Sequence, residues 1–219
     1  MTRGRDPALP VGPNPTVSLF AVESTRGAAP AARRPVVAAS GPAALAATTG
    51  FRPLATVSSG AMVSTGETAP TFSATYRGSD HETFDLAEHL GDGPVVLAFF
   101  PGAFTPPCSN EMVAIQDHIG EFEDAGATVL GISADSAFSL EAFAEEYGLE
   151  FDLVSDMGGA AIDAYGLAID IPELGLHDIA NRAVFVLDEE GTVSYEWVAE
   201  DPTNEPDYAE VVAAAEEAA

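Results

Sequence analysis

The chain has 219 residues, of which 47% are apolar, so it is long enough for one domain with a buried core and an extension. Its 35 acidic and 8 basic residues give a formal net charge of −27, which argues against nucleic acid as a partner because phosphate binding requires a basic surface. Its apolar runs fall short of the roughly 18 residues that a membrane span requires, and its single cysteine cannot form an internal disulfide.

The composition of the chain changes near residue 61. Residues 1–61 hold six of the eight arginines but only two acidic residues, and they show no sustained helical or strand period. Three interpretations are open: an arginine-rich targeting leader, a disordered tail, or sequence upstream of a natural start at Met62. The abrupt change from basic to acidic composition favours the third. We therefore expect a disordered or non-native extension at residues 1–61 and one folded domain at residues 62–219.

From Met62 onward, apolar residues alternate between the periods of strands and helices. Residues 94–100 (PVVLAFF), for example, are typical of a strand buried on both faces. In chain order, the predicted elements are extended segments at 71–76 and 83–86, a strand at 94–100, a helix at 109–124, a strand at 127–133, a helix from a cap at Asp135 or Ser136 to Tyr147, a strand at 150–154, a short helix at 159–165, a hairpin of strands at Ala183–Leu187 and Val193–Val198, and a terminal helix around residues 208–215. This order predicts an α/β fold with a central mixed sheet and helices on both faces.

The only cysteine, Cys108, follows the predicted strand at 94–100 through the linker 101–107 (PGAFTPP). Ligand sites of open α/β sheets lie beyond the carboxyl ends of the strands, which makes this linker a candidate site. Pro106 and Pro107 favour a first helical turn here, where unpaired N–H groups and the helix dipole favour an anion such as a thiolate. A lone cysteine is more commonly buried and inert, so its neighbours have to decide between the two interpretations.

Three neighbours are candidates for supporting a reactive thiolate. Thr105 lies three residues before Cys108, so its hydroxyl can reach the sulfur or a bound oxygen, or it can cap the helix. Arg182 is one of two arginines after residue 61; it could hold the thiolate ionised, or form a purely structural ion pair. Glu111 is interpreted first as a favourable carboxylate in the first helical turn. The four histidines lack the spacing of a metal site.

Together these residues form a recognisable motif. Pro101-x-x-x-Thr105-x-x-Cys108, preceded by VVLAFF and followed by Ser-Asn-Glu111, resembles the active-site motif of the peroxiredoxins. The resemblance is to one-cysteine members, near the bacterioferritin-comigratory and alkyl hydroperoxide reductase/thiol-specific antioxidant branches. It runs from about residue 65 to the C-terminus and includes residues 68–72 (TAPTF) and 182–188 (RAVFVLD), which are similar to the family's A-P-x-F and R-x-x-F-V-x-D segments.

The resemblance implies a thioredoxin-like fold and a thiol peroxidase that reduces hydrogen peroxide and small organic hydroperoxides without metal or other cofactor. Cys108 would attack the peroxide and become a sulfenic acid. Thr105 and Arg182 would orient the peroxide and stabilise the breaking O–O bond. In the same comparison, Pro101 would shield the pocket and Glu111 would position Arg182.

Many relatives carry a second, resolving cysteine, which this chain lacks. An external thiol, from a thioredoxin-like protein or a low-molecular-weight thiol, would therefore have to reduce the sulfenic acid. The resemblance also implies a homodimer. Two other functions stay open: a peroxiredoxin-like redox sensor or binding protein with negligible turnover, and a thioredoxin-fold scaffold with an inert cysteine.

The net charge leads to a separate expectation about the environment. Solubility requires a net charge of only about 2 to 8 in magnitude, far less than −27. We therefore expect adaptation to a salt-rich cytoplasm, because a Debye length of about 3 Å at 1 M salt screens the self-repulsion. The alternative is an acidic soluble protein without such adaptation.

Overall fold

The computed structural model describes residues 62–78, 80 and 82–219, so the interpretations of residues 1–61 lie outside the described residues. The described strands are β1 (Ser73–Tyr76), β2 (Thr83–Asp85), β3 (Val95–Phe99), β4 (Thr128–Ser133), β5 (Asp152–Ser155), β6 (Ala168–Ile171), β7 (Leu176–Ala180), β8 (Ala183–Leu187) and β9 (Val193–Val198). The α-helices are α1 (Pro106–Asp117), α2 (Ile119–Asp124), α3 (Ala137–Tyr147), α4 (Ala160–Ala164) and α5 (Tyr208–Ala218), with short 3₁₀ turns at Leu86–Glu88 and Pro172–Leu174.

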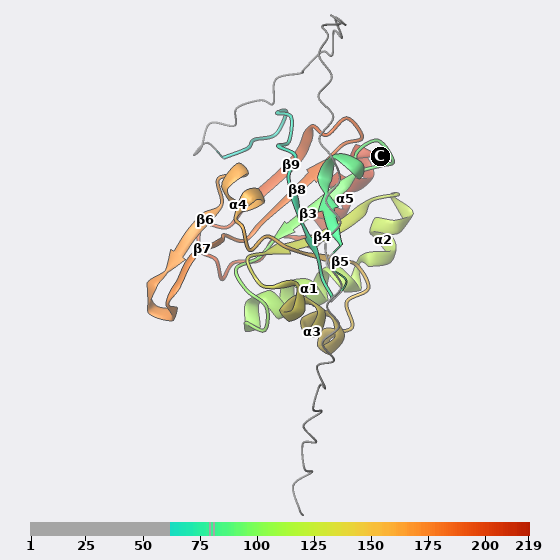
Figure 1. Ribbon diagram of the computed structural model, residues 1–219. Coiled ribbons are helices and arrows are strands. Elements are labelled where there is room, and N and C mark those ends of the chain that lie inside the picture. The colour runs from blue at the N-terminus through green and yellow to red at the C-terminus, as the bar shows by residue number, and fades with distance from the viewer. Residues whose placement is uncertain (1–61, 79, 81) are drawn as a thin grey trace, which may run out of the picture. The chain divides into compact units, whose positions relative to one another are not determined.

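Seven of these strands form one mixed sheet in the order β2-β1-β5-β4-β3-β8-β9. Figure 1 labels its strands β3, β4, β5, β8 and β9. The central strands β3, β4 and β5 are parallel, whereas β8 pairs antiparallel with β3 and β1 pairs antiparallel with β5. Parallel neighbours require crossover connections, which α1, α2 and α3 supply. The predicted α/β class with a mixed central sheet is confirmed.

The alternating side chains of β3 divide the interior into two cores. Val95, Leu97 and Phe99 pack on one face with α4, whereas Val96 and Ala98 pack on the other with α1, α2, α3 and α5. Because both faces are covered, every residue of β3 and β8 is buried. This explains why these two strands are visible in the sequence as uninterrupted apolar runs.

Two predictions about elements need correction, and one alternative that the sequence left open is resolved. The single helix at 109–124 is wrong: α1 begins at Pro106, and it is separated from α2 at His118, whose N–H donates to the carbonyl of Ile115. Such an i→i−3 bond tightens the turn and redirects the axis, while the apolar spacing continues. The strand predicted at 150–154 lies at Asp152–Ser155. The helix cap left open between two residues is Ser136, whose hydroxyl accepts from the N–H of Ser139.

The sequence patterns also miss a two-stranded sheet formed by β6 and β7 (orange in Figure 1), which pairs antiparallel beside the main sheet. Its strands have four and five residues and are separated by the 3₁₀ turn that begins at Pro172, so the alternation within each strand is too short to stand out. Among the described residues, no helix combines the length and apolar character of a bilayer-spanning segment.

Gly131 in β4 offers a test of how tightly the side chains of β5 and α1 pack around this strand. A Cβ atom here would lie 2.5 Å from Cδ2 of Leu153 and 3.3 Å from the sulfur of Met112, a residue of α1. We expect Gly131→Ala to lower the free energy of unfolding by about 1–3 kcal/mol, because a well-packed core resists added volume. Urea unfolding in concentrated salt measures this.

The matched control for this substitution is Gly120→Ala in α2, where an added Cβ meets no atom within 4 Å. We expect it to change the free energy of unfolding by less than about 1 kcal/mol. Equal effects of the two substitutions would contradict tight packing around Gly131.

Candidate functional site

Cys108 lies in the first turn of α1, where the chain leaves the carboxyl end of β3. Thr105 is the N-cap residue with an extended backbone (φ −82°, ψ 140°), and Pro106 and Pro107 are the first two residues of the helix. Prolines have no N–H, so the N–H of Cys108 is the first amide donor of the helix proper. The Cys108 side chain is 1% exposed. The predicted position of Cys108 at a helix start is confirmed.

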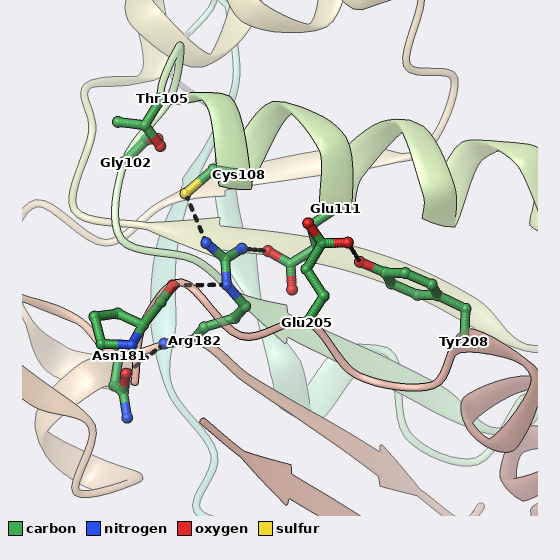
Figure 2. A network of polar contacts seen from close by, with 9 residues as sticks. Gly102, Thr105, Cys108, Glu111, Asn181, Arg182, Glu205 and Tyr208 are labelled. Carbon is green, nitrogen blue, oxygen red and sulfur yellow. Dashed lines mark hydrogen bonds and ion pairs between the residues drawn. The ribbon is translucent and has the colours of Figure 1, made fainter. Parts of the chain in front are cut away.

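Arg182 reaches the sulfur from the neighbouring strand. It lies one residue before β8, whose first residue, Ala183, pairs with Phe99 at the end of β3. The guanidinium is 1% exposed, and its Nη2 donates to Sγ of Cys108 at 3.4 Å. Its Nε donates to the carbonyl oxygen of Pro202 at 3.0 Å (Figure 2). The arginine that the sequence singled out is therefore in direct contact with the cysteine.

Glu111 occupies the other side of the same guanidinium and accepts a hydrogen bond from its Nη1 (Figure 2). The interpretation of Glu111 as a first-turn carboxylate is wrong, because α1 begins at Pro106 and Glu111 is in its second turn. It lies three residues after Cys108, so both side chains are on one face of the helix. The positioning contact with Arg182 that the resemblance implies is present.

The buried ion pair shifts the pKa values of both partners. Burial raises the pKa of Glu111 to about 8, although the charge and hydrogen bond of Arg182 oppose this rise. Burial lowers the pKa of Arg182, but the negative charges of Glu111 and Cys108 outweigh it, so the pKa is raised overall. Arg182 thus remains a cation beside the sulfur. The second oxygen of Glu111, Oε1, is buried and makes no hydrogen bond among the described residues.

Of the two roles expected for the hydroxyl of Thr105, the side-chain cap of the helix is wrong, and the contact with a bound oxygen stays a prediction. The hydroxyl caps no N–H of α1 and instead donates to the carbonyl oxygen of Gly102 at 2.9 Å. Because its proton is committed to Gly102, its lone pairs are available to accept a hydrogen bond from a bound O–H group. Thr105 thus lies on the linker that leads to Cys108, and its hydrogen bond to Gly102 fixes the direction in which its hydroxyl oxygen can accept.

One contact of the site has no signal in the sequence, and one predicted role is not tested by the structure. The carbonyl of Pro202, which holds Arg182, carries no sequence signal because every residue has a backbone carbonyl. Pro101 is buried two residues after the end of β3, at the start of the linker. Its role in shielding the pocket stays a prediction.

Comparison with known proteins identifies relatives of this arrangement. Residues 65–196 match the AhpC/TSA family. The chloroplastic peroxiredoxin Q of Triticum aestivum is 38% identical over 133 residues, which cover 61% of this chain and 58% of the wheat protein. The chain thus spans a little over half the length of that relative.

Solved structures show the same architecture. Peroxidoxin BcpB from Mycobacterium tuberculosis matches with a TM-score of 0.63 and 28% identity, covering 71% of this chain and 97% of that protein. A peroxiredoxin-like protein from Aquifex aeolicus matches with a TM-score of 0.63 and 28% identity, covering 73% of this chain and 90% of that protein. The expected thioredoxin-like fold is confirmed.

The raised pKa of Glu111 predicts a pH-dependent difference between the wild type and Glu111→Gln. A carboxyl with a folded-state pKa of about 8, above its ordinary 4.5, stabilises the fold fully below pH 4.5, and this contribution is lost as the pH rises through 8. The uncharged glutamine side chain of the variant does not titrate. We therefore expect the wild type to lose free energy of unfolding relative to Glu111→Gln between about pH 5 and about pH 9.

Urea unfolding of both proteins at constant high salt measures this difference. The contributions of the other carboxyl groups to the free energy of unfolding cancel in the comparison, because both proteins contain them. A difference that is independent of pH, or one in which the wild type gains stability as the pH rises, would contradict the assigned pKa of Glu111.

Proposed function

Because this chain belongs to the AhpC/TSA family, we propose that it is a thiol-dependent peroxidase that reduces hydrogen peroxide and small organic hydroperoxides through Cys108. The observation that carries the proposal is the hydrogen bond from the buried Arg182 to the sulfur of Cys108 at 3.4 Å. A buried guanidinium stabilises a thiolate, and the thiolate is the nucleophilic form of cysteine. An inert buried thiol would not require a buried cation at hydrogen-bond distance.

The peroxide step follows from the groups around the sulfur. The Cys108 thiolate attacks one peroxide oxygen, so an S–O bond forms while the O–O bond breaks. The electron pair of the broken bond leaves with the second oxygen, which takes up a proton and departs as water or an alcohol. Arg182 stabilises the charge that develops along this path, and Thr105 accepts a hydrogen bond from the substrate O–H because its own proton points at Gly102.

The recycling step requires a thiol from outside the chain. Cys108 becomes a sulfenic acid, and the 219-residue sequence contains no second cysteine. An external thiol condenses with the sulfenic acid and releases water, and a second thiol reduces the resulting mixed disulfide back to Cys108. We propose a thioredoxin-like protein or a low-molecular-weight thiol for this role. The expected homodimer stays a prediction, which sedimentation velocity can check.

We expect peroxide to oxidise the reduced protein far faster than it oxidises free cysteine, with Cys108→Ser unreactive. Arg182→Met should slow oxidation by about 10²–10³-fold, because one preorganised donor to the developing charge is lost. The matched control is Arg77→Met, the other arginine after residue 61, which bonds the Leu149 carbonyl and pairs with Glu141. Its rate should equal that of the wild type.

Stopped-flow mixing, with sulfenic acid trapping and mass spectrometry as the readout, measures these rates. Oxidation of the wild type no faster than that of free cysteine would refute the proposed peroxidase. Fast oxidation without recycling by any thiol would instead support the redox sensor.

We propose further that the protein works in a salt-rich cytoplasm. Residues 62–219 contain 33 acidic residues and two arginines, so the negative charges repel one another in dilute buffer. We expect the unfolding temperature to rise with potassium chloride concentration up to the molar range, where the Debye length is about 3 Å. A protein most stable in dilute buffer would rule this environment out.

A further inference from the structure

We propose that Asp135 is a positioning residue of the peroxidase site, which sets the linker 101–107 and, through it, the hydroxyl of Thr105. The inference rests on the proposed function and extends it to a residue that lies outside the Cys108 motif. Asp135 follows β4 by two residues, so its side chain extends from the edge of the sheet at which β3 also ends.

The carboxylate of Asp135 joins the linker to the sheet. Its Oδ2 accepts from the backbone N–H of Ala103 at 2.7 Å and from the hydroxyl of the fully buried Ser133 at 2.9 Å. The backbone carbonyl of Asp135 accepts from the hydroxyl of Ser155, in β5, at 2.6 Å. Asp135 is thus fixed by two central strands, and it holds the linker by a charge-assisted hydrogen bond.

The linker requires such an anchor because its conformation is strained. Phe104, directly after Ala103, has a φ of +63°, a left-handed conformation that is a genuine outlier for a bulky residue. Conformations of this kind persist only when the surroundings hold them. The ring of Phe104 packs against Phe143 with centroids 5.2 Å apart, but it is 49% exposed, so side-chain packing supports it from one side only.

The coupling to Thr105 passes through a single peptide unit. The N–H that Asp135 holds belongs to Ala103, and the carbonyl that accepts the Thr105 hydroxyl belongs to Gly102. These two groups are opposite ends of one planar trans peptide, so fixing the N–H also fixes the direction of the carbonyl. The Asp135 charge polarises the peptide as well, which strengthens the carbonyl as an acceptor. Asp135 therefore orients the lone pairs that Thr105 presents to the peroxide.

The test compares the rates at which peroxide oxidises Cys108 in three variants of Asp135 and one control variant. Circular dichroism first establishes that each variant is folded. Asp135→Ala should slow oxidation by about ten- to a hundredfold, because misplacement by about 1 Å has effects of this size. Asp135→Glu keeps the charge but moves the carboxylate by one methylene, so we expect a loss of about tenfold. Asp135→Asn keeps an oxygen acceptor for Ala103 and should restore the rate to within about threefold.

The matched control is Asp188→Ala. Asp188 is half-buried like Asp135 and accepts from a backbone N–H, that of Thr192, at the same distance of 2.7 Å, but in the turn between β8 and β9. We expect no change in the oxidation rate. Equal losses of oxidation rate in Asp135→Ala and Asp188→Ala would overturn the inference. So would a wild-type oxidation rate in Asp135→Ala or in Asp135→Glu.

A double mutant separates positioning from a general loss of stability. If Asp135 acts through Thr105, Asp135→Ala combined with Thr105→Val should react within about twofold of Thr105→Val alone, because the two residues form one unit. Additive losses would contradict this route.

Hydrogen exchange of the Ala103 amide distinguishes this inference from the proposed function. It should accelerate in Asp135→Ala and not in Asp188→Ala, even if the wild type proved unreactive to peroxide. An unchanged exchange rate would refute the anchor itself, whereas an unreactive wild type would refute only the peroxidase.

Discussion

The site depends on one buried cation, the guanidinium of Arg182, which contacts both a sulfur and a carboxyl group. The guanidinium of Arg182 contacts the sulfur of Cys108 on one side and the carboxylate of Glu111 on the other, and water reaches none of the three to any extent. Charges removed from water are tolerated only when they satisfy one another. The helix α1 contributes both partners, Cys108 and Glu111, from one face, so the position of this helix decides whether the guanidinium of Arg182 has partners.

The sheet brings these groups together through the direction of its strands. β3 and β4 are parallel, so their carboxyl ends lie at one edge, where Cys108 and Asp135 follow them. β8 runs antiparallel to β3, so its beginning lies at the same edge and delivers Arg182. Three distant segments therefore meet at one edge of a rigid layer. The strained linker between β3 and α1 can keep its conformation because this layer holds it.

The fold is predictable from the sequence where the local pattern of apolar residues matches the burial of the element. The strands β3 and β8 are apolar throughout because both of their faces are buried. The break between α1 and α2 was not predictable, since an i→i−3 turn at His118 leaves the helical spacing of apolar residues intact. The small sheet of β6 and β7 was not predicted because its strands are short and partly exposed.

Neighbouring residues are enough to predict a cysteine in the first turn of a helix, since Pro106 and Pro107 favour that turn, and a motif shared with a family. The contacts of that cysteine, by contrast, follow from the packing of distant segments. Arg182 and Cys108 are 74 residues apart, and their contact follows from the register between β3 and β8. The place of Glu111 in the second turn of α1, as a partner of Arg182, has the same origin. Strand register and helix packing are set by groups far apart in the chain, which no local pattern records.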